Sequence, residues 1–289
     1  MIIHDLAGCL RIRQWTKNTI LFAALIFSNH ANEFGYIIRS TLAFLLFSFA
    51  AGAVYTFNDL LDLEHDRQHP VKRNRPIASD RLSVKAGWII VSLLIITSLP
   101  LSFAFDTNFG SAVLVYVVLQ LAYSRFLKNI VILDVFVISF GFLLRVIAGA
   151  LAIHVVISNW ILVCTMLLAL FLALSKRRHE LTLLENNADA HREILREYSP
   201  YLLDQMIGIV TSATLVAYII FTLSNETTTK FGDEMILTVP FVLYGIFRYL
   251  YLVHRKKAGG QPEEVLLSDT PLQLTIIGYG ITALLVIYF

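Results

Sequence analysis

The stretch YIIRSTLAFLLFSFAAGAVYTFNDLLDLEHD, residues 36–66, changes abruptly from an apolar run to a group of acids. The run up to Phe57 carries a single charged residue, Arg39. The acids that follow it are Asp59, Asp62, Glu64 and Asp66. Carboxylates this close in the chain repel one another unless a cation joins them. The stretch therefore predicts an apolar segment that ends in a cation-binding group.

The composition of the whole chain indicates a membrane protein. Of the 289 residues, 57% are hydrophobic and 15% are charged, and the mean hydropathy of +0.69 is too high for a water-soluble globule. Apolar stretches of about 20 residues, the length of a spanning helix, recur at 15–30, 36–57, 84–105, 109–123, 130–150, 156–175, 206–224, 235–253 and 271–289. They are too long and too uniformly apolar for barrel strands. We predict an all-α polytopic membrane protein, with about nine transmembrane helices in one domain over 1–289.

The basic residues predict the orientation of these helices in the inner (cytoplasmic) membrane. The stretch at 15–30 has no small-residue cleavage site after it, so it reads as a retained helix. All but three of the 23 lysines and arginines fall on one side of the predicted spans; the exceptions are Arg39, Arg145 and Lys230. By the positive-inside rule, the N-terminus and the acidic group face the cytoplasm. An odd number of spans then places the C-terminus outside.

The spacing of the acids predicts a metal site. If the helix continues past Phe57, Asn58, Asp62 and Asp66 lie at i, i+4 and i+8 on one face, with Asp59 one step round. Mg²⁺ takes oxygen ligands, usually one or two carboxylates with substrate phosphates and water. We therefore predict that these four residues bind Mg²⁺ and form the catalytic group. A solvated charged loop is the alternative, but it explains neither the spacing nor the leading asparagine.

A basic run follows the acids and predicts phosphate binding. It includes Arg67, Lys72 and Arg75, and arginine offers a bidentate fork to phosphate while lysine offers a point charge. The pairs His69-Pro70 and Arg75-Pro76 favour turns that fold the run back over the acids.

These residues also resemble a known family. NDLLDLEHD matches the NDxxDxxxD motif of the UbiA superfamily of intramembrane prenyltransferases, whose members have nine helices around a cavity under an Asp-rich cytoplasmic cap. Further stretches resemble the branch of polyprenyl-phosphate phosphoribosyltransferases. They are RQWTKN from Arg13, HPVKRNRPIAS from His69, YSRFLKN from Tyr123, LDVFVISFGFLLRVIAGA from Leu133, KRRHEL from Lys176 and GGQPEEVLLSDTPLQL from Gly259.

The resemblance implies a reaction and its partners. The branch implies Mg²⁺-dependent transfer of 5-phosphoribose from phosphoribosyl pyrophosphate to a polyprenyl phosphate, with release of pyrophosphate. The sequence does not specify the chain length of the lipid. An alternative is a prenyltransferase that joins a prenyl diphosphate to an aromatic acceptor, and a non-enzymatic alternative is a transporter. We expect the lipid bilayer and these substrates as partners and no nucleic acid. The sequence leaves the oligomeric state open.

One segment departs from the aromatic prenyltransferases of the superfamily. They carry a second acidic motif, DxxxD, after the sixth span, where this chain has SKRRHELTLLENNADAHRE. Lys176 and Arg177 stand there and are expected to bind the 5-phosphate of the donor, and Glu180, the nearest acid, is expected at the same substrate site. A plain cytoplasmic helix end is the alternative, and Asp189 with Glu193 leaves a second acidic site open.

A charged residue within a span gives the last site prediction. Arg145 lies deep in an apolar stretch, where a charge must face a cavity or a partner. Asp134, Gly141 and Arg145 share one helical face, so we predict that Asp134 and Arg145 point into one cavity, with Gly141 leaving room between them. The alternatives are a structural Arg145 that caps carbonyls and an Asp134 that only caps its helix. We expect three further residues to line the cytoplasmic mouth: Lys17, Tyr123 and Lys128.

Overall fold

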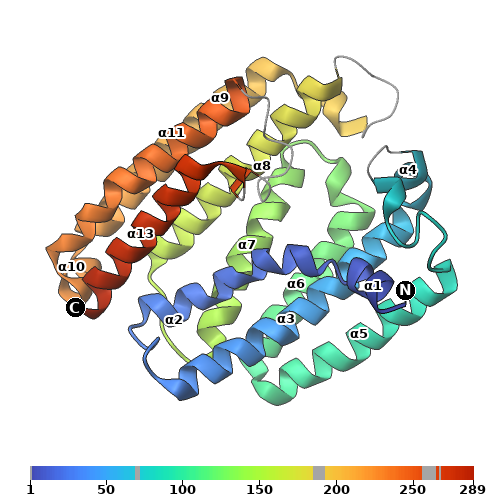
Figure 1. The fold of residues 1–289 in the computed structure, drawn as a ribbon, viewed down its shortest axis with the longest axis horizontal. Coiled ribbons are helices and arrows are strands. Elements are labelled where there is room, and N and C mark those ends of the chain that lie inside the picture. The colour runs from blue at the N-terminus through green and yellow to red at the C-terminus, as the bar shows by residue number, and fades with distance from the viewer. Residues whose placement is uncertain (1, 69–71, 185–192, 256–264, 267) are drawn as a thin grey trace. The chain divides into compact units, whose positions relative to one another are not determined.

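The computed structural model describes residues 2–68, 72–184, 193–255, 265–266 and 268–289 (Figure 1). Every regular element in this part of the chain is an α-helix or a 3₁₀-helix, which confirms the predicted all-α class. The chain forms two compact units, residues 1–157 and 158–289. That the two units make one membrane domain stays a prediction.

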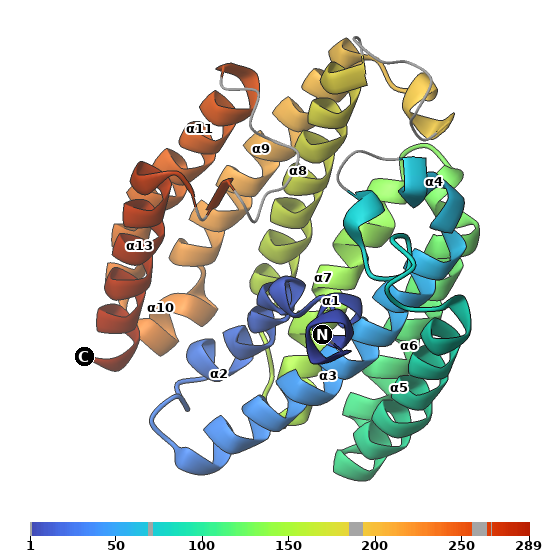
Figure 2. The same ribbon diagram turned by 45° about the vertical axis from the view of Figure 1, so that its right-hand side comes forward.

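The first unit is built around the long helix α3. Its elements are α1 (Ile2–Cys9), η1 (Ile12–Phe22), α2 (Ala23–Phe27), α3 (Phe34–Leu61), α4 (Leu63–Gln68), η2 (Lys72–Asn74), α5 (Val84–Phe105), α6 (Thr107–Arg125), η3 (Leu127–Asn129) and α7 (Leu133–Ala152). Helix α3 packs along α5 and α6, and α7 packs on α6 and η1. Figures 1 and 2 show α3 and α5 side by side in both views. The core of this unit therefore lies between α3, α6, α7 and η1.

Small residues allow the elements of this core to approach closely. Ala43, Ala50 and Ala51 of α3 are fully buried. A Cβ on Gly149 of α7 would lie 2.2 Å from the carbonyl oxygen of Leu21 in η1. Such close backbone approach is how transmembrane helices pack, because burial of apolar surface gives little gain in lipid. A side chain at position 149 would push η1 away from α7.

The helix boundaries follow ordinary capping chemistry. The Ser83 hydroxyl accepts a hydrogen bond from the Ala86 N–H at the start of α5, and the Asp106 carboxylate accepts one from the Phe109 N–H at the start of α6. Each cap satisfies an N–H that has no partner inside its helix. Asp106 also ends α5, so one residue fixes the tight connection between two spans.

Eight helices in the described residues are long and apolar enough to cross a membrane. They correspond to eight of the nine predicted stretches. The exception is 15–30, which forms η1 and α2 in place of one α-helix. An 11-residue 3₁₀-helix rises about 22 Å, and the 5 residues of α2 add about 8 Å. This segment packs along α3 and α7 and has about the length of the hydrocarbon core.

The second unit is a separate set of long helices. Its elements are α8 (Asn159–Leu184), η4 (Glu193–Glu197), α9 (Pro200–Leu223), α10 (Asn225–Phe231), η5 (Asp233–Thr238), α11 (Val239–Arg255) and α13 (Thr270–Tyr288). Helix α8 packs along α9, and α11 packs along α13. Gly278 of α13 lies against the Phe241 ring of α11, so a missing side chain again brings two helices together.

Large apolar side chains are exposed along the spans of both units. Leu93 and Ile96 of α5 are 60% and 70% exposed, and Ile209 of α9 is 69% exposed. In water such a surface would be costly, whereas in a bilayer it contacts lipid tails. The exposure agrees with an integral membrane protein.

Candidate active site at the end of helix α3

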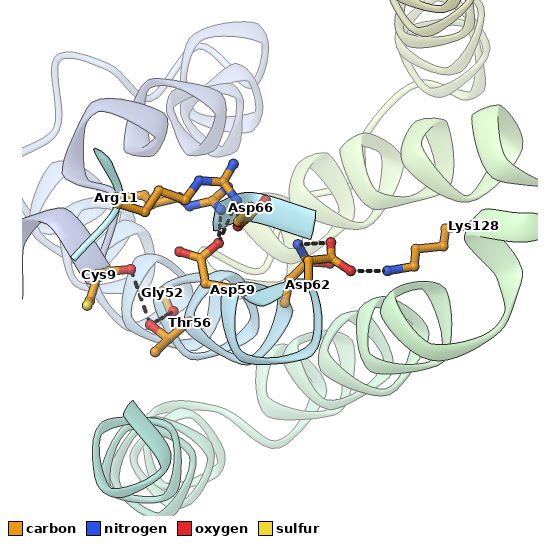
Figure 3. Close-up of polar contacts among 10 residues, drawn as sticks. Cys9, Arg11, Gly52, Thr56, Asp59, Asp62, Asp66 and Lys128 are labelled. Atoms are coloured by element: carbon orange, nitrogen blue, oxygen red, sulfur yellow. Dashed lines mark hydrogen bonds and ion pairs between the residues drawn. The ribbon is translucent and has the colours of Figure 1, made fainter. Parts of the chain in front are cut away.

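The acidic group lies where α3 ends and α4 begins. Asp62 is the C-terminal cap of α3, with φ −92° and ψ 11°. Helix-like hydrogen bonds continue across this point, from the Asp62 N–H to the Asn58 carbonyl (3.0 Å) and from the Asp66 N–H to the Asp62 carbonyl (2.8 Å). The change of backbone conformation at Asp62 turns the side chains that follow. The acids therefore divide into two groups in place of the single predicted ladder (Figure 3).

The first group joins Asp59 and Asp66 through arginine. Arg75 Nη1 lies 3.0 Å from Asp59 Oδ1 and also donates to Asp66 Oδ2. Arg11 donates to the same oxygen of Asp59 (Figure 3). The two carboxylates are 3% and 2% exposed, so their charges are withdrawn from water and depend on these arginines.

The second group contains Asp62. Its Oδ2 accepts a hydrogen bond from Asn58 Nδ2 at 3.0 Å, and its Oδ1 lies 2.5 Å from Lys128 Nζ. Lys128 lies in η3, between α6 and α7. Lys128, which we expected at the cytoplasmic mouth, thus meets the acidic group, and its contact with substrate stays a prediction. We call the six charged residues of the two groups the acid–base cluster: Arg11, Asp59, Asp62, Asp66, Arg75 and Lys128.

The N-terminal segment is fixed against α3, which places Arg11. The Thr56 hydroxyl donates to the carbonyls of Gly52 (2.9 Å) and Cys9 (3.2 Å). Arg81 pairs with Asp5 at 3.2 Å and so holds α1 from the other side. Burial, together with the charges of Asp59 and Asp5, raises the pKa of the Cys9 thiol to about 11. The thiol is therefore protonated at neutral pH and contributes packing, not chemistry.

The donor set of the cluster fits a hard divalent cation. It consists of carboxylate and amide oxygens, the ligands that Mg²⁺ prefers. In the described residues no three acidic, histidine or cysteine side chains converge on one point. Asp59 and Asp66 nevertheless both place an oxygen against the same cationic nitrogen of Arg75. Two carboxylates of this chain can thus share one cation.

Arg145 lies deeper in the first unit and is 4% exposed. Its Nε donates to Asn18 Oδ1 (2.7 Å), its Nη2 to the Tyr116 hydroxyl (2.9 Å), and its Nη1 to the Gly141 carbonyl (2.7 Å). The guanidinium also lies over the rings of Phe47, Tyr116 and Phe142. These contacts link η1, α3, α6 and α7 and favour the structural alternative for this residue.

Two other predictions on helix α7 differ from the structure. Gly141 does not leave open space, because a Cβ there would lie 2.8 Å from Gln120 Nε2. Asp134 is fully buried, and the N-cap of α7 is Ile132. The interpretation of Asp134 as the helix cap is therefore wrong; it stands in the first turn, where a negative charge suits the helix dipole.

The remaining substrate-binding candidates of the first unit are Arg67, Lys17, Lys72 and Tyr123. Arg67 pairs with two acids at the surface, Glu64 (3.3 Å) and Asp80 (2.7 Å). Lys17, Lys72 and Tyr123 are half-buried. That these four residues contact substrate stays a prediction.

The KRRHEL segment lies in α8, in the second unit. Arg177 is 2% exposed and pairs with Glu180 at 2.5 Å. Arg178 pairs with Asp204 of α9, which also lies 3.3 Å from His254 Nε2 of α11. Lys176 is half-buried. Asp189 and the side chain of Glu193 lie outside the described residues, so the second acidic site stays a prediction.

Sequence reasoning missed two residues that complete these polar groups, Arg11 and Asn18. Nothing in the local sequence pattern indicates that Arg11 pairs with Asp59, whose charge it neutralises. Asn18 belongs to the quoted RQWTKN stretch, but nothing in its spacing showed that it meets Arg145, 127 positions away. Polar residues within the apolar stretch at 15–30 were the available signal, since a buried amide needs a partner.

Comparison with known proteins places this chain in a family. Residues 19–263 match the model of the UbiA prenyltransferase family. The chain is 34% identical over 285 residues to the decaprenyl-phosphate phosphoribosyltransferase of Corynebacterium glutamicum, covering 96% of this chain and 85% of that one. It is 32% identical over 303 residues to the protein of the same name in Mycolicibacterium smegmatis, covering 100% and 94%.

A solved structure supports the same conclusion at the level of the fold. The UbiA homologue of Archaeoglobus fulgidus, solved bound to DMAPP and Mg²⁺, superposes with a TM-score of 0.72 at 16% identity. The match covers 98% of this chain and 99% of that one. With the family match over most of the chain and the described helices, the chain belongs to the UbiA prenyltransferase family.

Proposed function

We propose that this protein transfers 5-phosphoribose from phosphoribosyl pyrophosphate to a polyprenyl phosphate and releases pyrophosphate. The observation that carries the proposal is the acid–base cluster at the end of α3. It stands in a chain similar over nearly its whole length to proteins named decaprenyl-phosphate phosphoribosyltransferase. The name of those relatives supplies the substrate pair.

The acids and the bases of the cluster have separate tasks in this reaction. Asn58, Asp59, Asp62 and Asp66 are the residues that would hold Mg²⁺, which when bound neutralises the negative charge of the leaving pyrophosphate. Arg11, Arg75 and Lys128 reach the same place from three other segments and would bind the phosphate oxygens. Lys72 and Arg67, on the same basic run, would extend this contact.

The bond changes need no covalent enzyme intermediate. A phosphate oxygen of the lipid attacks the anomeric carbon of the donor while the bond from that carbon to pyrophosphate breaks. The transition state resembles an oxocarbenium ion, as in glycoside cleavage. Because a lipid phosphate is already anionic, it needs no general base, and the work of the protein is orientation and charge stabilisation.

The KRRHEL segment would bind the other end of the donor. Lys176, Arg177 and Glu180 lie on one stretch of α8, and a basic group suits the 5-phosphate better than a second metal. The soluble donor would arrive from the cytoplasm and the polyprenyl phosphate from the bilayer. The N-terminus and the cluster would both face the cytoplasm, as the distribution of basic residues predicts.

The aromatic prenyltransferase is the second candidate, favoured by the fold match to a homologue bound to DMAPP. The test is incubation of the purified protein and Mg²⁺ with radiolabelled phosphoribosyl pyrophosphate and decaprenyl phosphate. Label in the organic phase is expected. If label stays in water while a prenyl diphosphate and a hydroxybenzoate give product, the aromatic reaction is the correct one. Uptake of a solute into liposomes without any covalent product would instead indicate a transporter.

A further inference from the structure

The acid–base cluster is electrically balanced. Its carboxylates are Asp59, Asp62 and Asp66, and each forms an ion pair with Arg11, Arg75 or Lys128. Three negative charges therefore meet three positive ones, and Asp59 and Asp66 are almost completely buried. The charge of every carboxylate in the cluster is therefore already compensated by a basic side chain before any metal binds.

This balance makes entry of a bare divalent cation unfavourable. A metal that binds Asp59 Oδ1 and Asp66 Oδ2 must displace the Arg75 nitrogen that contacts both of these oxygens. The displaced guanidinium stays close by, because its chain is anchored: the Arg75 N–H bonds to the Lys72 carbonyl at 2.9 Å. The site would then hold two surplus positive charges in a largely buried place, which costs free energy.

A diphosphate removes this cost. It brings several negative charges and oxygens that arginine binds with a bidentate fork. A displaced arginine or lysine thus exchanges a carboxylate for a phosphate at little loss of pairing. Metal and diphosphate together restore the balance that metal alone would disturb.

The location of the six residues suits such an exchange. The acids lie on or between the helices α3 and α4. The bases lie in short connections: Arg11 between α1 and η1, Arg75 after η2, and Lys128 in the three-residue η3. Side chains on connections can turn from carboxylate to phosphate while the helices that carry the acids keep their place.

We propose that Arg11, Arg75 and Lys128 act as internal counter-cations that block free divalent metal from the acids, so that metal binds together with a diphosphate group. This regulation rests on the proposed function only in placing metal and diphosphate at this cluster. It holds for either donor, phosphoribosyl pyrophosphate or a prenyl diphosphate. Binding of metal and diphosphate is then strongly and reciprocally coupled.

The test measures Mn²⁺ binding to the purified full-length protein in detergent by titration calorimetry. Titrations run with and without inorganic pyrophosphate, and a protein-free titration corrects for metal bound by pyrophosphate in solution. We expect Mn²⁺ to bind at least about tenfold more tightly when pyrophosphate is present, in the usual range of coupling between two ligands. Equal Mn²⁺ affinity with and without pyrophosphate overturns the proposal, and this comparison needs no variant.

Variants locate the effect in the counter-cations. Arg75→Gln and Arg11→Gln should each raise the affinity for Mn²⁺ alone by about tenfold and reduce the coupling to pyrophosphate. The matched control is Arg81→Gln, which removes the same charge from a residue that pairs with Asp5. If the cluster variants bind Mn²⁺ alone no better than wild type and Arg81→Gln, the bases do not compete with metal. Arg75→Lys keeps the charge and should retain the coupling. This variant provides the test if Arg75→Gln does not fold.

The outcome is separate from the reaction test. If pyrophosphate coupling is found but no label moves from phosphoribosyl pyrophosphate to lipid, the counter-cation role stands and the proposed donor is wrong. If label moves but coupling is absent, the proposed function stands and the counter-cation role fails.

Discussion

The end of α3 and the C-terminal part of α8 carry opposite helix-borne charges, and their ion pairs are built differently. At the end of α3, acids stand on the helix and are paired with bases from connecting segments. On α8, the bases Arg177 and Arg178 stand on the helix and pair with Glu180 and Asp204. At the end of α3 the acids are therefore held more rigidly than the bases on connecting segments, whereas on α8 both partners of each pair stand on helices.

As part of the proposed function, we expect the two regions to take different kinds of phosphate group. Helix-borne carboxylates suit a metal and its diphosphate, while helix-borne arginines and lysines suit a phosphate without metal. A prenyl diphosphate has only the first kind of group. Phosphoribosyl pyrophosphate has both, which is why the charge reversal on α8 favours it. The predictions below test whether the two regions behave differently.

The largest effect is expected from Asp62→Asn. The substitution keeps the size of the side chain but removes the charge that pairs with Lys128 and a proposed metal ligand. We expect a loss of activity of about 10²- to 10³-fold, the usual result of removing one stabiliser of transition-state charge. The measurement is the rate of label transfer to lipid at saturating substrates.

Glu64→Gln is the control for this substitution. Glu64 lies two residues away on α4 and its side chain is 76% exposed, paired only at the surface with Arg67. Its neutral variant should keep nearly full activity. Equal losses in both variants would mean that the general negative charge of this end matters, not the particular position of Asp62.

Arg145→Met should lower the stability of the fold and leave ligand binding unchanged. The variant removes the hydrogen bonds of Arg145 to Asn18 Oδ1 and the Tyr116 hydroxyl, and each buried polar group left unsatisfied costs about 1–3 kcal/mol. We expect a clearly lower unfolding temperature in detergent, with donor KM unchanged in the molecules that remain folded. A normal unfolding temperature with a raised KM would instead support the ligand-binding alternative.

Lys176→Gln tests the basic region of α8. If Lys176 binds the 5-phosphate, donor KM should rise about tenfold, the value of one charge-assisted hydrogen bond, while the dependence of the rate on Mg²⁺ stays the same. Lys230→Gln, on α10, is the matched control and should change neither. A shift in the Mg²⁺ dependence of Lys176→Gln would contradict the division between the two regions.

The fold could be predicted largely from the sequence, because a chain inside the hydrocarbon core of a membrane can adopt very few backbone structures. A long apolar run must form a helix or a closed barrel, so eight spans were placed from composition alone. The segment at 15–30 was predicted as one α-helix and forms η1 and α2. Its backbone packs directly against α7 at Gly149, a contact between distant positions that local periodicity does not reveal.

Only the acidic residues of the candidate site could be predicted from the sequence, and not the bases that pair with them. The spacing of the acids marked the end of α3, but a helix that turns at Asp62 separates residues that an unbroken helix would align. The partners Arg11 and Lys128 are 48 and 66 positions from their acids. Their approach depends on how η1 and η3 pack, and this is decided by tertiary contacts.

The smallest effect is expected on the alkylation rate of Cys9. Its thiol takes no part in the reaction, but its pKa depends on the charges of the nearby acids. Burial, followed by the charges of Asp59 and Asp5, raises the pKa of its thiol to about 11. At pH 7.5 the thiolate fraction of Cys9 is then about 100-fold below that of a cysteine with its ordinary pKa of 9.0. Iodoacetamide should label it slowly, and faster as the pH rises towards 11.

Asp59→Asn removes one of the charges that raise the pKa of Cys9 and should speed labelling, while Glu64→Gln should leave the labelling rate unchanged. Mass spectrometry of the Cys9 peptide measures the rate; labelling as fast as in the unfolded chain would show that α1 does not cover this thiol against α3.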